Sequence, residues 1–162
     1  MHELNQLAEQ LAAALLQRHQ TLAVAESCTG GWVAKVLTDL PGSSRWFDRG
    51  FVTYSNAAKQ EMLGVPGDTL ETGGAVSEAT VAAMAGGVLQ NSLADVALAI
   101  SGIAGPGGER PGKPVGTVCF SWQQRGEGAR VETRHFSGDR NNVRQQAVIH
   151  AIEVLLDELG GT

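Results

Sequence analysis

Three residues in the first half of the chain, Ser44, Tyr54 and Lys59, are of types that can cleave an amide without a metal. Such a reaction needs a nucleophile, a group that takes its proton, and donors for the oxyanion that forms. A serine can be the nucleophile with a lysine as base, provided that burial or neighbouring cations lower the lysine pKa. A capping serine, a packed tyrosine and a solvated lysine would show the same spacing, so the spacing alone leaves both interpretations open.

A second candidate is the turn 27–31 (SCTGG), which joins an apolar run to a stretch with helical spacing. A strand that enters a helix through such a turn directs backbone N–H groups at one point, where an anion or a developing oxyanion can bind. We therefore expect this turn to line a pocket with Ser27, Thr29, Gly30 and Gly31. Helix capping would explain the same residue types. Cys28 is an alternative nucleophile, because a helix N-terminus can lower a thiol pKa, although a buried cysteine often only packs.

Two further motifs contribute polar groups. Ser101 and Gly102 follow the apolar run 95–100, and loops after buried strands are where α/β sheets bind ligands. We expect both residues to face a ligand, with a purely conformational role as the alternative. Arg140 and Arg144 lie one helical turn apart near the start of the last predicted helix. One of them could bind a phosphate through two parallel hydrogen bonds, whereas a solvated arginine is the other interpretation.

Apolar periodicity and turn residues predict the elements that must position these groups. The predicted helices cover residues 4–15, 30–40, 56–63, 78–89 and 139–159. The predicted strands cover 21–26, 47–54, 95–100, 115–122 and 129–136, with loops at 68–75 and 101–114. Helices interleaved with strands, plus one late hairpin, predict a three-layer α/β/α sandwich with a mixed sheet. No linker interrupts the pattern, so we expect residues 1–162 to form one domain.

The composition narrows the class of partner. With 43% hydrophobic and 18% charged residues the chain is globular, and a net charge of −5 argues against a nucleic-acid surface. No apolar run is long enough to span a membrane and the start lacks a signal peptide, so we expect a cytoplasmic protein. The phosphate-binding P-loop and Rossmann patterns are absent, and no grouping has metal-ligand spacing. We therefore expect neither a cofactor nor a metal.

Several motifs together resemble the CinA C-terminal domain family. They are AESCTGG (25–31), FVTYSNAAK (51–59), GAVS (74–77), GIAGP (102–106) and KPVGTV (113–118), which occur in this order over nearly the whole chain. The resemblance implies an α/β/α fold and a homodimer. It also implies a small-molecule nucleotide substrate, because stand-alone members hydrolyse nicotinamide mononucleotide to nicotinate mononucleotide and ammonia. The alternative is a domain that binds a nucleotide or regulates without catalysis.

The same resemblance assigns roles by motif. It implies Ser44 as nucleophile, with Ser43 or Ser27 as alternatives, and Lys59 and Tyr54 in proton transfer. It places Ser27 and Thr29 in the pocket wall, Ser101 where the family more often has threonine, and Arg140 as a candidate phosphate ligand. The segment 109–111 (ERP) departs from the family's usual Gly-Gly-Ser pattern, which changes the shape of that rim.

Overall fold

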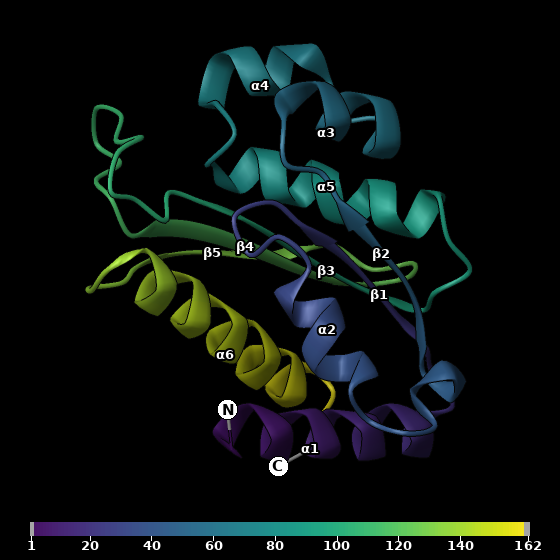
Figure 1. The fold of residues 1–162 in the computed structure, drawn as a ribbon. Helices are drawn as coiled ribbons and strands as arrows, with labels where there is room; N and C mark the ends of the chain where they lie inside the picture. Colours follow the sequence, from purple (N-terminus) through teal and green to yellow (C-terminus); the bar gives the residue numbers. More distant parts are fainter. Residues whose placement is uncertain (1, 161–162) are drawn as a thin grey trace.

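Five strands form one mixed sheet in the order β2-β1-β3-β4-β5 (Figure 1). The computed structural model describes residues 2–160. Strands β1 (Leu22–Glu26), β2 (Phe47–Val52) and β3 (Val96–Gly102) run parallel to one another. Strands β4 (Thr117–Gln124) and β5 (Arg130–His135) continue the sheet as an antiparallel hairpin, as predicted.

Helices cover both faces of this sheet. Helices α3 (Asn56–Leu63), α4 (Gly67–Gly73) and α5 (Glu78–Gln90) lie on one face (Figure 1). Helices α2 (Trp32–Thr38) and α6 (Arg140–Glu158) lie on the other, and α1 (His2–Arg18) packs against both. The predicted three-layer α/β/α arrangement with a mixed sheet is therefore confirmed.

The central strands divide their side chains between two cores. Every residue of β1 is buried, and alternate residues of a strand point to opposite faces. Leu22 and Val24 accordingly join the core beneath α2 and α6, whereas Ala23 and Ala25 join the core beneath α5. The small side chains on the α5 face let that helix approach closely. A continuous apolar run is what a strand covered on both faces requires.

Residues 68–75, which were predicted to be a loop, differ from that prediction. Gly67–Gly73 forms helix α4, and Gly74 follows it with a positive φ of 76°. The helix is short and has glycine at both ends, so it lacks the long apolar periodicity on which the prediction depended. Pro66 before its start and Asp68 in its first turn are the local signals that favour a helix there.

The order of the parallel strands determines where a ligand can enter. The chain leaves β1 through α2 to reach β2 on one side, and later reaches β3 on the other side of β1 through α5. Such a reversal of strand order on the two sides of β1 leaves a crevice at the carboxyl ends of the strands. Within residues 2–160, no helix combines the length and the hydropathy that crossing a membrane requires.

Candidate active site

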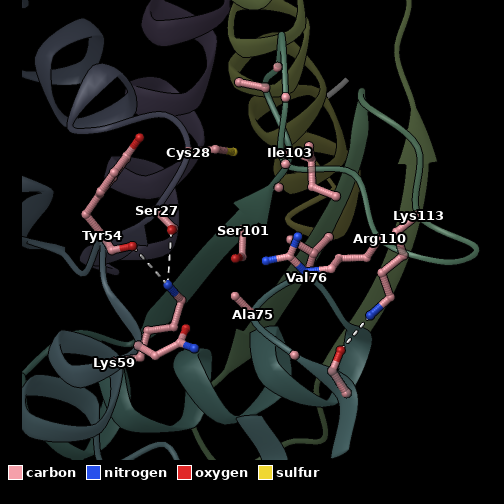
Figure 2. A pocket seen from close by; sticks show the side chains of 18 of the residues that line it. Ser27, Cys28, Tyr54, Lys59, Ala75, Val76, Ser101, Ile103, Arg110 and Lys113 are labelled. Atoms are coloured by element: carbon pink, nitrogen blue, oxygen red, sulfur yellow. Dashed lines mark hydrogen bonds between the residues drawn. The ribbon is translucent and has the colours of Figure 1, made fainter. Parts of the chain in front are cut away.

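A pocket of about 700 Å³ opens at the carboxyl ends of the parallel strands (Figure 2). Its lining comes from the ends of β1 and β2, from α3, from segments 72–76 and 101–113, and from the start of α6. The volume lies within the range of small-molecule pockets in proteins. Within residues 2–160, no three His, Cys, Asp or Glu side chains gather where they could hold a metal ion.

Lys59 and Ser27 meet at the inner wall of this pocket. Ser55 caps the N-terminus of α3 by accepting a hydrogen bond from the Ala58 N–H, and this helix carries Lys59 back toward β1. The Lys59 Nζ lies 3.1 Å from the Ser27 Oγ (Figure 2). It also lies 3.0 Å from the carbonyl oxygen of Thr53 and 3.5 Å from that of Tyr54. Lys59 is only 1% exposed, so these contacts replace water around its amine.

The surroundings of Lys59 favour its neutral form. Burial lowers the pKa of Lys59 below that of an ordinary lysine, because desolvation penalises the ammonium ion. A neutral amine has two N–H donors and one lone pair. As an ammonium ion, Lys59 donates to the Ser27 hydroxyl oxygen. Once the amine is neutral, the two carbonyl oxygens, which can only accept, take its N–H groups and leave the lone pair for the Ser27 hydroxyl proton. This geometry is that of a base facing the proton of a nucleophile.

The carboxylate of Glu26 holds the turn 27–31 in place. Glu26 is 1% exposed, and its two oxygens accept hydrogen bonds from the N–H groups of Val33 and Ala34 at 3.0 Å each. The same carboxylate accepts the Thr29 hydroxyl at 2.6 Å. The first-turn N–H groups of α2, which the sequence predicted as an anion site, are therefore occupied by Glu26. The turn positions Ser27, and the helix end does not face a ligand.

Thr29, Gly30 and Gly31 do not line the pocket. Thr29 is fully buried against Glu26, and both glycines have positive φ values, 58° and 103°. A side chain at Gly30 would contact the Arg144 guanidinium, and one at Gly31 would contact Val52. Of the four residues predicted to bind substrate in this turn, only Ser27 lines the cavity. The other three give the turn its shape.

Arg144 of α6 restrains the same turn from the face of the sheet that α2 also covers. Its Nε donates to the carbonyl oxygen of Cys28 at 2.9 Å and its Nη2 donates to that of Thr29 at 3.2 Å. The guanidinium also stacks over the Trp32 ring, 5.4 Å from its centroid. Arg144 is thus a structural clamp, and neither the phosphate ligand nor the solvated arginine that the sequence suggested.

Cys28 lines the pocket as a thiol. Burial raises its pKa to about 12, an effect that the nearby Arg144 cation only partly offsets. The side chain is 6% exposed. The thiolate, which is the reactive form, is therefore strongly disfavoured near neutral pH. The geometry supports the packing interpretation of Cys28.

Ser44 is not brought to Lys59 or Tyr54. It lies exposed in a short 3-10 helix (Ser43–Arg45) that precedes β2, whereas Tyr54 and Lys59 follow that strand. The six residues of β2 span roughly 20 Å in extended conformation. Ser44 therefore lies at the amino-terminal end of β2, whereas the pocket opens at the carboxyl ends of the strands. Ser44 does not line the pocket. This separation argues against Ser44 as the partner of Lys59.

Tyr54 and Arg140 form one wall of the pocket. The Arg140 Nη2 donates to the Tyr54 hydroxyl at 3.2 Å, and its Nη1 donates to the Gly105 carbonyl oxygen at 2.8 Å. The Tyr54 side chain is 62% exposed, and it is its backbone carbonyl that contacts Lys59. The structure therefore brings both predicted residues to the cavity, with their side chains bonded to each other.

Ser101 and Gly102 line the pocket at the end of β3. The Ser101 hydroxyl is buried and has no hydrogen-bond partner within residues 2–160. A buried polar atom without a partner is costly, and a bound ligand could supply one. Gly102 packs closely, since a Cβ there would lie 2.8 Å from Val118 and 3.1 Å from the Cys28 sulfur. A side chain at this position would therefore disturb the wall beside Ser27.

Sequence reasoning missed two cations on the rim, Arg110 and Lys113. Together with Lys59 and Arg140 they make four basic side chains that line the cavity, and none of the carboxylates of residues 2–160 lines it. The protein as a whole carries a net charge of −5, so the pocket differs sharply from the average surface. The Pro-Gly turn between Arg110 and Lys113 was the available signal that these side chains would be held together.

Comparison with known proteins gives consistent matches along the whole chain. The family model described as CinA C-terminal domain matches residues 4–159. "Nicotinamide-nucleotide amidohydrolase PncC" of Escherichia coli K12 is 56% identical over 154 residues, which cover 94% of this chain and 93% of the relative. The protein of the same name from Pseudomonas putida is 48% identical, with coverage of 96% and 97%. A CinA-like protein of Akkermansia muciniphila is 52% identical over 88% of this chain but only 34% of its own length.

Solved structures agree with these matches. A CinA superfamily protein from Klebsiella pneumoniae 700603 has a TM-score of 0.94 at 41% identity, with 97% of this chain and 98% of that chain covered. The competence/damage inducible protein CihA from Agrobacterium tumefaciens has a TM-score of 0.92 at 42% identity, with coverage of 98% and 96%. Fold and sequence similarity thus extend over the elements that build the pocket.

Proposed function

The chain belongs to the CinA C-terminal domain family, and we propose that it hydrolyses the carboxamide of nicotinamide mononucleotide to nicotinate mononucleotide and ammonia. Relatives about half identical over nearly their whole length bear the name of this activity. The observation that carries the proposal is the buried Lys59 amine 3.1 Å from the Ser27 hydroxyl inside a cationic pocket.

In the proposed reaction, Ser27 is the nucleophile in place of Ser44. Lys59 takes the Ser27 proton as the oxygen attacks the carboxamide carbon, and the carbonyl electrons move onto oxygen. When the C–N bond breaks, Lys59 returns the proton to the departing nitrogen, which leaves as ammonia. Water then attacks the acyl ester, again losing its proton to Lys59, and the Ser27 oxygen departs and regains its proton. The carboxylic acid that is released loses its proton to solvent, so the products are a carboxylate, a proton and free enzyme.

Ser101 is placed to assist this chemistry. Its hydroxyl, which has no hydrogen-bond partner among residues 2–160, lines the same cavity as Ser27 and Lys59 (Figure 2). We propose that it donates a hydrogen bond to the substrate carboxamide oxygen, where negative charge develops. The Tyr54–Arg140 pair forms the wall against which the nucleotide lies. In this assignment Tyr54 acts through its ring and its backbone carbonyl, and proton transfer is left to Lys59.

The electrostatics of the pocket fit a mononucleotide. The substrate carries a phosphate dianion at one end and a pyridinium cation at the other. The three cations other than Lys59, which are Arg110, Lys113 and Arg140, can attract the phosphate. Lys59, which burial drives toward its neutral form, avoids repelling the pyridinium ring. A fully charged lysine beside that ring would oppose binding.

The assembly and location of the enzyme are further parts of the proposal. We propose that residues 1–162 act as one domain, that two copies form a homodimer, and that the protein works in the cytoplasm without a cofactor. Family resemblance supports the dimer. Cross-linking or light scattering of the purified protein gives its mass in solution, and a monomeric mass would contradict the dimer.

Incubation of the pure protein with nicotinamide mononucleotide, with ammonia and nicotinate mononucleotide as readouts, tests the activity. Turnover that Lys59→Met abolishes while nucleotide binding persists would support the proposal. The alternative is a domain that binds the nucleotide without catalysis. Binding by the wild-type protein with no ammonia released, with or without added divalent metal, would favour that alternative.

A further inference from the structure

The loop between β3 and β4 holds two cations in a fixed arrangement at the rim of the pocket. Residues 110–113 form a tight turn in which the Arg110 N–H donates to the Lys113 carbonyl at 3.0 Å and the Lys113 N–H donates to the Arg110 carbonyl at 2.8 Å. Pro111 followed by Gly112, whose φ is 74°, is the signature of a type II turn. Arg110 and Lys113 are therefore directly opposite one another.

This arrangement places two basic residues opposite each other in the turn. Side chains of directly opposed residues in an antiparallel bridge project from the same face, and like charges there repel. Within residues 2–160, no carboxylate oxygen lies within 4 Å of either cation. Other basic residues, such as Lys35 and Arg130, do form ion pairs with carboxylates. The sequence thus retains an uncompensated cationic pair. An anion that bound between or beside the two side chains would relieve the repulsion.

The two cations differ in how much of their hydrogen-bonding capacity is used. The Lys113 Nζ donates to the Gly73 carbonyl at 2.5 Å, which ties the loop to the end of α4 (Figure 2). The Arg110 guanidinium makes one hydrogen bond within the described residues, from Nη1 to the Glu109 carbonyl at 3.3 Å. Figure 2 shows the Arg110 side chain pointing from the loop into the pocket, toward the side on which Ser101 lies.

Arg140, which the sequence suggested as the phosphate ligand, makes hydrogen bonds within the protein instead. Two of its guanidinium nitrogens already bond the Gly105 carbonyl and the Tyr54 hydroxyl. Those bonds orient it as part of the wall. Arg110 keeps most of its planar fork free, and that fork matches two oxygens of a phosphate.

We propose that Arg110 recognises the phosphate monoester of the substrate and that the charge of Lys113 supports it. This assignment rests on the proposed function, because it takes the substrate to be a mononucleotide. Specificity for the phosphorylated substrate over the bare nucleoside then resides in the 110–113 turn.

The test compares wild type with Arg110→Gln on two substrates, nicotinamide mononucleotide and nicotinamide riboside, which lacks the phosphate. We expect kcat/KM for the nucleotide to fall about 10- to 100-fold, the effect of losing a charge-assisted pair, and kcat/KM for the riboside to stay unchanged. Arg134→Gln is the matched control, since Arg134 is an exposed arginine on β5 that does not line the pocket. It should leave both values unchanged. Equal losses on both substrates, or no loss on the nucleotide, would overturn the proposal.

A binding experiment separates this proposal from the activity itself. Calorimetric titration with ribose 5-phosphate, and with ribose as the phosphate-free control, needs no turnover. Wild type should bind the phosphate ester, and Arg110→Gln should bind it at least about tenfold more weakly. That result would support the phosphate site even if the wild-type protein released no ammonia. Equal affinity of the two proteins, or no binding by either, would reject it. Thermal melting of both proteins checks that the variant is folded.

Discussion

Lys59 Nζ and Ser27 Oγ lie 3.1 Å apart, although 32 residues separate them in the chain. The contact depends on two neighbouring parallel strands, β1 and β2, whose carboxyl ends lie at the same end of the sheet. Ser27 directly follows β1, and Lys59 lies in the first turn of α3, which begins shortly after β2. In the neutral form of Lys59, the two carbonyl oxygens that accept from its amine orient the lone pair toward the hydroxyl. The proposed chemistry depends on this one contact.

Substitution of Ser27 distinguishes the two candidate nucleophiles. We expect Ser27→Ala to lower kcat by about 10³-fold or more, since covalent catalysis would be lost and, among residues 2–160, Ser27 has the one hydroxyl that hydrogen-bonds Lys59. Ser44→Ala is the matched control, because Ser44 is exposed at the far end of β2. It should retain the wild-type rate. The reverse pattern, with Ser44→Ala inactive and Ser27→Ala active, would show that the geometry has been misassigned.

The pH dependence of the reaction should report the state of Lys59. A base must be neutral to accept a proton, and burial lowers the pKa of Lys59 from the ordinary value of 10.5. We therefore expect kcat/KM to be flat above the lowered pKa and to fall about tenfold per pH unit below it. The midpoint should lie below 10.5. A profile that rises as pH falls would contradict a lysine base. Lys59→Arg, which cannot deprotonate, should be inactive at every pH.

Much of the fold could be predicted from local pattern. Helix α3 has the predicted bounds, 56–63, because a serine caps its start and a glycine in the left-handed region ends it. The short helix α4 was missed because it has glycine at both ends and one buried residue, Leu70, so it shows no apolar periodicity. Ser44, which does not line the pocket, illustrates how strand order bears on the choice of site residues. Polar residues at the carboxyl ends of parallel strands gather at one end of the sheet. Ser44 precedes its strand, whereas Ser27 and Tyr54 follow theirs and Ser101 lies at the end of β3. Attention to that order would have favoured Ser27.

Other features of the site depend on long-range contacts that no spacing reveals. Arg144 reaches the turn 27–31 from a helix more than 100 residues later, with nothing in its local sequence to mark that contact. Glu26 uses the N-terminus of α2 for its own carboxylate, so a motif that resembles an anion site is internally satisfied. In both cases the residue types were informative, but their partners were decided by the packing of α2 and α6 on one face of the sheet.

Cys28 should be dispensable for the reaction. Its pKa of about 12 keeps the thiol protonated at neutral pH, and the side chain is buried beside Gly102. We expect Cys28→Ala to keep kcat within about threefold of wild type and to cost about 1 kcal/mol of stability for the small cavity it leaves. Iodoacetamide at pH 7 should leave the native protein unlabelled at this position by mass spectrometry. Rapid alkylation with parallel loss of activity would instead identify a reactive thiolate.

Arg144 offers a test of whether the turn must be held rigidly for catalysis. Its two hydrogen bonds fix the carbonyls of Cys28 and Thr29, the residues that directly follow Ser27. Arg144→Lys keeps the positive charge but loses the planar fork that reaches both oxygens and stacks on Trp32. We expect the free energy of unfolding to fall by about 1–3 kcal/mol, measured in urea, and kcat to fall about tenfold with KM little changed. We expect kcat to change more than KM because Arg144 does not line the pocket and acts on substrate only through Ser27. A variant that lost stability but kept the wild-type kcat would show that the clamp serves the fold alone.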